Sequence, residues 1–166
     1  METISWCLSI KNGIELVEQN KNLSLAYLKK AEDSLKVLSQ ISESREWKIT
    51  SAYYSMYFSL YSILMKIGIK CENHGCTLAF MRELLKNYFE EIDIKDIEEA
   101  RGLRVDALYY ADREVPSEKY KNLLKNAPLF FVKCKEVLIK IKEEDIKAIR
   151  EKIRVLKEEQ IKKKQK

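Results

Sequence analysis

Two arginines, three acids and two tyrosines are concentrated in the segment Glu98-Glu-Ala-Arg101-Gly-Leu-Arg104-Val-Asp-Ala-Leu-Tyr-Tyr110. Arg101 and Arg104 are three residues apart, so on a helix they share a face and could grip a phosphate with their forked donors. Asp106 lies about 200° round the helix from Arg104. It precedes Tyr110 by four residues, a spacing that lets it orient the Tyr110 hydroxyl or a neighbouring helix. The segment predicts a phosphate-binding site at Arg101 and Arg104, with Asp106 and Tyr110 as supporting residues of a groove.

The alternative for the same arginines is a purely structural use. Glu98 would then pair with Arg101 within the helix, and Arg104 would form a salt bridge to a neighbouring helix. In that case replacing both arginines would lower the melting temperature and leave nucleotide and RNA binding unchanged.

A second polar cluster, Cys71-Glu-Asn-His74-Gly-Cys76, gathers three side chains that could bind a metal. A structural zinc site needs four ligands, usually with a second pair at a defined spacing, and only Cys134 is left as a fourth. We therefore expect no metal and no cofactor. We expect Asn73 or Thr77 to cap the following helix and His74 to form a hydrogen bond in the loop. His74 is the only histidine, and the spacing of the residues around it indicates no Ser-His-Asp or Cys-His catalytic arrangement. The sequence also contains no glycine-rich phosphate-binding loop.

The stretch Ser51-Ala-Tyr-Tyr-Ser-Met-Tyr-Phe-Ser-Leu-Tyr-Ser-Ile-Leu64 holds four of the nine tyrosines and no charged residue. Projected on a helix, its serines form a narrow strip, and aliphatic and aromatic side chains occupy the rest of the circumference. Such a helix is predicted to be the central, most buried one. The serines would allow close approach of another backbone, and buried tyrosine hydroxyls would need partners. A ligand-stacking role for the rings is the alternative to a core and interface role.

Helical spacing continues through the whole chain, and no segment alternates convincingly with the period of a strand. Asn22 or Ser24 is expected to cap the second helix, Gly68 to end the third, and Ser117 to cap the last. A loop is expected over residues 69–75 and a bend at Pro128. Helices are predicted at residues 3–19, 24–40, 77–89, 94–110 and 117–141. The helix of the tyrosine-rich stretch is predicted to follow a capping segment at residues 42–46 and to end at about residue 67.

These elements predict an all-α protein, an up-and-down bundle of four to five main helices with an added N-terminal helix, in one domain over residues 1–141. Residues 142–166 form a basic helical C-terminal tail, whose ten basic and six acidic residues carry most of the net charge of +5. Any general attraction to nucleic acid belongs to this tail. A seam of apolar residues in the tail is expected to pack on the body or on a second subunit: Ile146, Ile149, Ile153 and Leu156.

The chain shows no membrane-spanning run and no signal peptide. The four cysteines follow no disulfide-scaffold spacing, so we expect free thiols in a reducing cytoplasm.

The order of these features resembles the HEPN domain family. The matching pieces are Ala26-Tyr-Leu-Lys-Lys-Ala-Glu-Asp-Ser-Leu35, Ser51-Ala-Tyr-Tyr-Ser-Met-Tyr-Phe58, Ile67-Gly-Ile-Lys-Cys-Glu-Asn-His74-Gly75, Arg104-Val-Asp-Ala-Leu-Tyr-Tyr110 and a final helix after Val115-Pro-Ser117. The resemblance covers about residues 23–141, and the helix with tyrosines followed by the Gly-Ile and His-Gly pieces is similar to small stand-alone HEPN proteins.

The resemblance implies a homodimeric helical bundle with a groove near the dimer axis, often paired with a minimal nucleotidyltransferase in a toxin–antitoxin system. In some relatives the nucleotidyltransferase attaches AMP to a tyrosine near the signature, which points to Tyr109 or Tyr110 as an acceptor. Many HEPN proteins are metal-independent ribonucleases whose signature is an arginine followed after four to six residues by a histidine. Arg104 matches that arginine, but Leu108, Tyr109 and Tyr110 occupy the positions where the histidine would stand.

The expected function is therefore a nucleotide- or RNA-binding and protein-interaction module that is not an enzyme. The alternative is a metal-independent RNase toxin that uses Arg104 with a noncanonical partner, for which His74 is the candidate.

Overall fold

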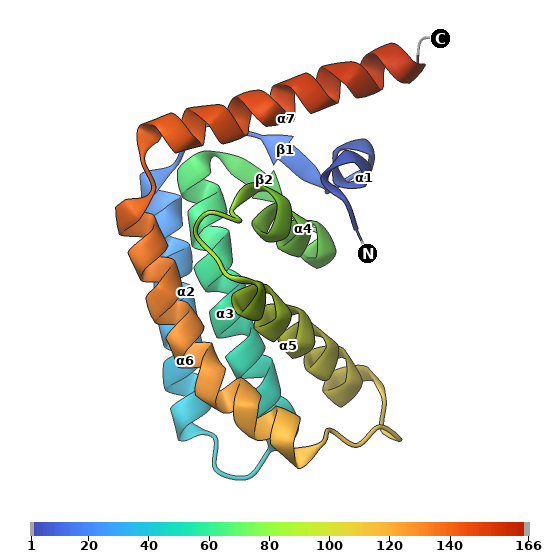
Figure 1. The fold of residues 1–166 in the computed structure, drawn as a ribbon. Helices are drawn as coiled ribbons and strands as arrows, with labels where there is room; N and C mark the ends of the chain where they lie inside the picture. The colour runs from blue at the N-terminus through green and yellow to red at the C-terminus, as the bar shows by residue number, and fades with distance from the viewer. Residues whose placement is uncertain (1, 165–166) are drawn as a thin grey trace.

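The computed structural model describes residues 2–164 and shows a helical bundle with a two-stranded sheet at one end (Figure 1). Within that range the helices are α1 (Ile4–Ser9), α2 (Lys21–Gln40), α3 (Arg45–Ile67), α4 (His74–Leu84), α5 (Glu91–Tyr109), α6 (Ser117–Lys140) and α7 (Glu143–Lys164). The strands are β1 (Ile14–Leu16) and β2 (Ile69–Cys71). The predicted all-α bundle is confirmed.

Helix α3 is the centre of the bundle. It packs against α2, α5 and α6 and contributes more residues to the core than any other helix. It begins at the Ser44 cap and ends at Gly68, which has a φ of 82° and donates its backbone N–H to the carbonyls of Leu64 and Met65. A left-handed residue at that position is how many helices end, and glycine adopts it without steric conflict. No helix in the described part of the chain is both long and apolar enough to span a membrane.

The serine strip of α3 brings α2 close, as the sequence predicts. Ser55, Ser59 and Ser62 are fully buried, and each hydroxyl donates to a backbone carbonyl of its own helix. The carbonyl of Ser62 also accepts a 2.7 Å hydrogen bond from the Ser24 hydroxyl of α2. Because these side chains are small and their hydroxyls are satisfied, two helix backbones approach without leaving unpaired polar atoms. Ser24 is therefore a packing residue rather than a cap, and Asn20 caps α2 instead.

The predicted helix over residues 3–19 is wrong beyond its first turns. α1 ends at Ser9, and Asn12 has a φ of 61° that no helix continues through. At Gly13 a Cβ atom would lie 1.9 Å from the carbonyl oxygen of Cys7, so only glycine fits this turn. The chain then extends as β1, which pairs with β2 antiparallel in the register Ile14↔Cys71. These short strands form because the backbone N–H and C=O groups of each pair with those of the other. The sequence does not predict them, because three residues are too few to show the alternating pattern of a strand.

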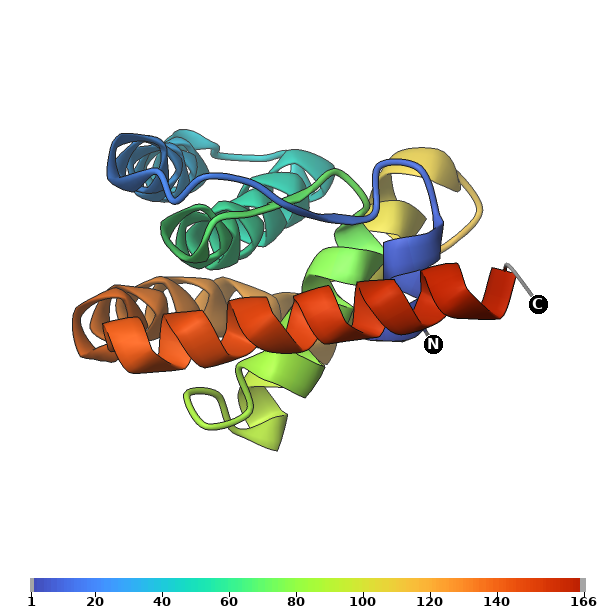
Figure 2. The ribbon, with the colours of Figure 1, turned by 90° about the horizontal axis from the view of Figure 1, so that it is seen from above.

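The C-terminal helix α7 belongs to the body. The predicted seam packs there: Ile146, Ile149 and Ile153 are buried in the common core. Figure 2 shows α7 lying across one end of the bundle, where it contacts α1. Arg150 fixes it further, since its Nη1 lies 2.9 Å from the carbonyl oxygens of Val17, Ile67 and Gly68. The seam's alternative role as a contact with a second subunit is therefore not needed to explain its burial.

The remaining helix ends differ by a few residues from the predicted ones. α4 begins at His74 rather than near residue 77, because Asn73 accepts a hydrogen bond from the Cys76 N–H and so caps the helix, as one of the two expected caps. The cap predicted at Ser117 is wrong, since Ser117 is already helical and no side chain caps that end. α6 continues through Pro128.

Replacing Tyr57 with alanine should lower the free energy of unfolding by about 3 kcal/mol, because the substitution removes a buried ring and leaves a cavity in the core. Tyr57 is 6% exposed and its ring stacks on that of Tyr53 in the same helix. Urea denaturation of the two proteins measures the difference. Trp47→Ala is the control, because Trp47 is on the same helix but 60% exposed, and it should change stability by less than about 0.5 kcal/mol. An unaltered stability of Tyr57→Ala would contradict the core assignment.

Candidate anion-binding site

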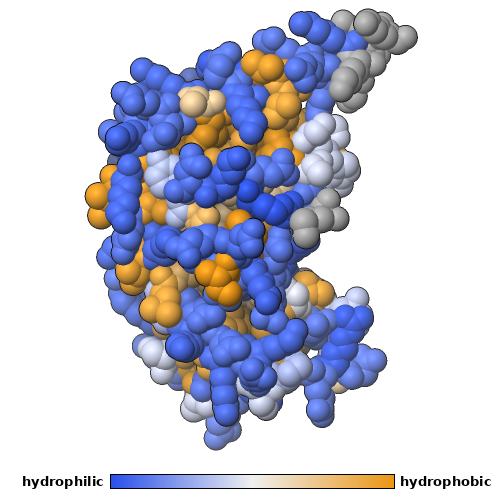
Figure 3. All heavy atoms as spheres, in the orientation of Figure 1, coloured by the Kyte–Doolittle hydropathy of each residue, from blue (hydrophilic) through white to orange (hydrophobic). Residues whose placement is uncertain are grey.

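The structure brings Arg101, Arg104 and His74 to one place, although His74 is far from the arginines in sequence. The arginines come from the second half of α5, and His74 is the first residue of α4. They meet beside Tyr53 and Tyr54 of α3. In Figure 3 the right-hand edge of the molecule is hollowed between the part that carries α1 and α4 and the end of α5. The sequence pairs Arg101 with Arg104 on one helical face, and it connects His74 with Arg104 only in the RNase alternative.

Arg104 is surrounded by aromatic rings rather than by acids. Its guanidinium carbon lies 5.3, 5.6 and 5.9 Å from the ring centroids of Tyr53, Tyr54 and Tyr109. Its Nη1 donates to the Tyr54 hydroxyl over 3.4 Å, a long contact. Among the described residues it forms no ion pair, and its Nε is a buried atom without a hydrogen-bond partner. The interhelical salt bridge that a structural role predicts for Arg104 is therefore not formed within residues 2–164.

Within residues 2–164 Arg101 forms one ion pair, and its partner is not the predicted one. Its Nη1 lies 3.4 Å from Oε1 of Glu2, near the start of the sequence. Glu98 instead pairs with Arg82 of α4 at 2.7 Å. These four side chains and Leu78 line an open hollow of about 250 Å³. Arg101 is thus accessible to a ligand, but a carboxylate of the same chain already contacts it.

His74 is held on the core and is neutral. Its ring stacks on Tyr57 with the centroids 4.0 Å apart, and its Nδ1 lies 2.6 Å from the Tyr53 hydroxyl oxygen. Burial, followed by the charges of Arg104 and Arg101, lowers the pKa of His74 to about 4. Near neutral pH the imidazole therefore carries one proton, on one of its two nitrogens.

The Tyr53 hydroxyl decides which nitrogen carries that proton. Tyr53 is fully buried, and burial raises its pKa, so the hydroxyl keeps its hydrogen. The acceptor that the described residues offer to this hydrogen is Nδ1 of His74. A buried hydroxyl that failed to donate would lose a hydrogen bond in a place that water does not reach. Tyr53 therefore donates to Nδ1, and the imidazole proton lies on Nε2, which makes His74 a donor toward any ligand.

Asp106 and Tyr110, the predicted supporting residues, belong to a different cluster. Asp106 pairs with Arg113 at 2.5 Å, and the Arg113 guanidinium lies 3.5 Å from the ring centroid of Tyr110. Asp106 therefore holds the arginine that covers the Tyr110 ring and does not orient its hydroxyl. Tyr110 and Arg113 line another hollow of about 540 Å³, which extends to Arg45 at the start of α3. The ring of Tyr109, which precedes Tyr110 in the chain, lies instead beside Arg104.

The sequence missed Glu2 and Gly75 as members of the site. Gly75 is buried, and a Cβ atom there would lie 2.2 Å from Glu2 Oε1 and 3.2 Å from Arg101 Nη1. The glycine therefore lets the Glu2 carboxylate lie directly against the start of α4. No sequence signal connects Glu2 with Arg101, because the contact spans 99 residues and Glu2 has no periodic pattern around it.

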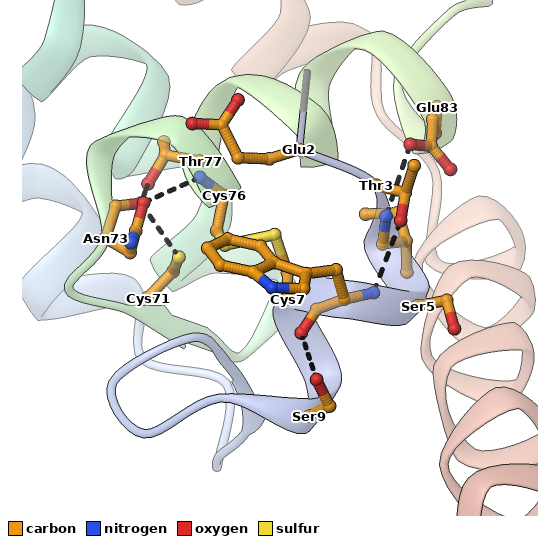
Figure 4. Close-up of a disulfide and its surroundings, with 12 residues drawn as sticks. Glu2, Thr3, Ser5, Cys7, Ser9, Cys71, Asn73, Cys76, Thr77 and Glu83 are labelled. Atoms are coloured by element: carbon orange, nitrogen blue, oxygen red, sulfur yellow. Dashed lines mark hydrogen bonds between the residues drawn. A yellow bond between two sulfur atoms is a disulfide. The ribbon is translucent and has the colours of Figure 1, made fainter.

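A disulfide joins Cys7 of α1 to Cys76 of α4, so the prediction of four free thiols is wrong (Figure 4). The two Cα atoms are 5.5 Å apart, within the usual range for a disulfide, although 69 residues separate them in sequence. Cys71 and Cys134 are free and buried, and burial raises the pKa of both thiols. With Cys76 bonded to Cys7, the metal set of Cys71, His74 and Cys76 is not available. The described residues hold no other group of three His, Cys, Asp or Glu side chains that could bind a metal.

Stability should depend on pH through His74. The unfolded imidazole has a pKa of about 6.5, and the folded one has a pKa of about 4. The unfolded state therefore binds more protons between these values, so stability is highest above about pH 6.5 and falls as the pH drops toward 4. Urea denaturation at a series of pH values should show a steeper fall for the wild type than for His74→Gln. Parallel curves would contradict the assignment of a neutral, buried His74.

No family model matches the chain, and no curated protein matches it. The resemblance to HEPN proteins therefore rests on the motifs quoted above. What this protein does has to be argued from the geometry of the Arg101, Arg104 and His74 cluster.

Proposed function

We propose that the protein binds the phosphate of a nucleotide or of RNA at Arg101, Arg104 and His74. The observation that carries the proposal is that each of the three presents a donor and two are cations. Among the described residues Arg104 pairs with no carboxylate, and its one side-chain hydrogen bond is the 3.4 Å contact to the Tyr54 hydroxyl, so an anion would balance its charge and accept hydrogen bonds from its guanidinium. Phosphate oxygens accept several such bonds at once, and arginine's planar fork matches their geometry.

The ring of Tyr109 supports a nucleotide rather than a bare phosphate as the ligand. It is 68% exposed and lies 5.9 Å from the Arg104 guanidinium. An exposed aromatic ring beside a phosphate-binding arginine is an arrangement on which a base can stack while its phosphate is held. The aromatic rings of α3 are not needed for this role, because they are packed in or against the core.

The proposal extends to the partners that the HEPN resemblance implies. A homodimer, a minimal nucleotidyltransferase as partner and a cytoplasmic location belong to it. Tyr109 and Tyr110 remain the proposed AMP acceptors, since their side chains are 68% and 42% exposed. A cytoplasmic protein would have to keep its disulfide in a reducing compartment, and the complete burial of Cys7 and Cys76 shields that bond.

A metal-independent RNase is the second candidate, and the position of His74 beside the arginines favours it. Helix α5 contains no histidine, but His74 of α4 lies beside the arginines of α5. The hydrogen bond from Tyr53 weighs against it, because a general base needs a free lone pair and His74 has Nδ1 occupied and Nε2 protonated. Cleavage would first require that bond to break, so binding is the function we favour.

Arg104→Ala should weaken the binding of AMP and of a labelled oligouridylate by about tenfold or more, the value of one charge-assisted hydrogen bond. Fluorescence anisotropy measures the oligouridylate, and competition measures AMP. Arg154→Ala is the control: it removes the same charge from an exposed position on α7 that is paired with Glu151. Equal losses in the two variants would contradict a site at Arg104 and indicate general attraction to positive charge.

The protein incubated with tRNA and mRNA in EDTA should leave both intact, because His74 cannot accept the 2′-hydroxyl proton. Gel electrophoresis of the RNA gives the result. Cleavage that disappears in both Arg104→Ala and His74→Gln would contradict the binding function and establish the RNase. Tyr53→Phe is the informative companion variant, since it removes the hydrogen bond to Nδ1.

A further inference from the structure

Residues 2–9 form an arm that is fastened to α4 at several points, and we call it the N-terminal arm. The Cys7–Cys76 disulfide is its covalent attachment. Figure 4 shows Glu2 and Thr3 at one end of the arm, beside α4, and Glu83 accepting the hydrogen bond from the backbone of Ile4. Arg82 also donates to the carbonyl oxygen of Glu2 over 2.6 Å. The arm is thus held along its length against the helix whose first residue is His74.

The tip of the arm places a negative charge in the proposed anion site. Glu2 Oε1 lies 3.4 Å from Arg101 and against the backbone at Gly75, next to His74. A hydrogen bond from its own backbone outweighs burial and, with the charge of Arg101, lowers the pKa of Glu2. Glu2 is therefore a carboxylate near neutral pH. A ligand phosphate that approaches Arg101 competes with it for the same guanidinium.

We infer that the N-terminal arm is an autoinhibitory element, in which Glu2 occupies Arg101 as an internal anion and the Cys7–Cys76 disulfide sets how firmly it does so. The inference rests on the proposed binding function. A tethered group has a high effective concentration at its site, and that concentration falls when the tether is cut. With the disulfide intact, Glu2 is confined near Arg101. With two thiols in its place, only hydrogen bonds, packing and one partly exposed ion pair retain the tip.

The chemical step that relieves the inhibition is reduction by a dithiol. Two electrons and two protons pass from the dithiol to the disulfide, giving the thiols of Cys7 and Cys76 and leaving the reductant as a disulfide. Both sulfur-bearing residues are fully buried, so the arm must open locally before a reductant can attack. Reduction of the disulfide is therefore slow compared with the binding of a ligand. The disulfide sets the position of the arm over many binding events rather than at each one.

Glu2→Gln is the direct test, because it removes the competing charge and keeps the size of the side chain. Binding of AMP should become about two- to fivefold tighter, as expected for loss of a partly exposed ion pair. Glu15→Gln is the matched control: it makes the same charge change on β1, where Glu15 is exposed and faces no arginine of the site. It should leave the affinity unchanged.

Cys7→Ser and treatment with dithiothreitol test the disulfide. Each should tighten AMP binding, and in Cys7→Ser the further gain from Glu2→Gln should shrink. The fluorescence of Trp6, which lies on the arm and is 45% exposed, reports arm movement in a Trp47→Phe background. Addition of AMP should change the Trp6 emission of the disulfide-bonded protein.

The outcomes separate this inference from the function on which it rests. If Arg104→Ala abolishes AMP binding but Glu2→Gln and Glu15→Gln both equal the wild type, the autoinhibitory arm is refuted and the binding site stands. If neither the wild type nor Glu2→Gln binds AMP or oligouridylate, the proposed function is refuted and the arm with it. If Glu2→Gln alone binds more tightly but Cys7→Ser and dithiothreitol have no effect, the control by the disulfide is refuted.

Discussion

The burial of the tyrosines of α3 is the constraint on which the rest of the structure depends. A helix that is apolar over most of its surface must be covered on several sides, and α2, α5 and α6 do this. A tyrosine ring can be buried readily, but its hydroxyl needs a hydrogen-bond partner once water is excluded. The hydroxyl of Tyr53 finds His74, that of Tyr54 accepts from Arg104, and that of Tyr61 accepts from the backbone of Cys71. Two of these three partners, His74 and Arg104, belong to the candidate site.

This coupling explains why the site consists of donors. Tyr53 must donate inward, so it takes the acceptor nitrogen of His74 and leaves the donor nitrogen for a ligand. Arg104 lies among ring faces that attract its positive charge without neutralising it, as a cation over aromatic rings does. The site therefore keeps uncompensated positive charge at the edge of a well-packed core. An anion would relieve this condition, and Glu2 already does so in part at Arg101.

Much of the fold could be predicted because its signals are local. The central position of α3, its end at Gly68, the serine strip and the burial of the α7 seam follow from spacing and from residue size, and all are found. The prediction of a helix over residues 3–19 is wrong between residues 10 and 19, which include Asn12 and Gly13. There a turn and a pairing with β2 determine the conformation. A strand of three residues is too short to show the alternating pattern from which strands are predicted.

For the site, the sequence by itself determined which side chains could do chemistry: Arg101 and Arg104 on one helical face, and a single histidine after a cap. The sequence could not determine which side chains from other elements lie next to them. The tertiary structure alone placed His74 beside the arginines, moved Asp106 to Arg113, bonded Cys7 to Cys76 and set Glu2 on Arg101. The physical reason is that spacing along a helix specifies neighbours within about one turn. Contacts between distant segments depend instead on how the helices pack, and here they pack around the tyrosines of α3.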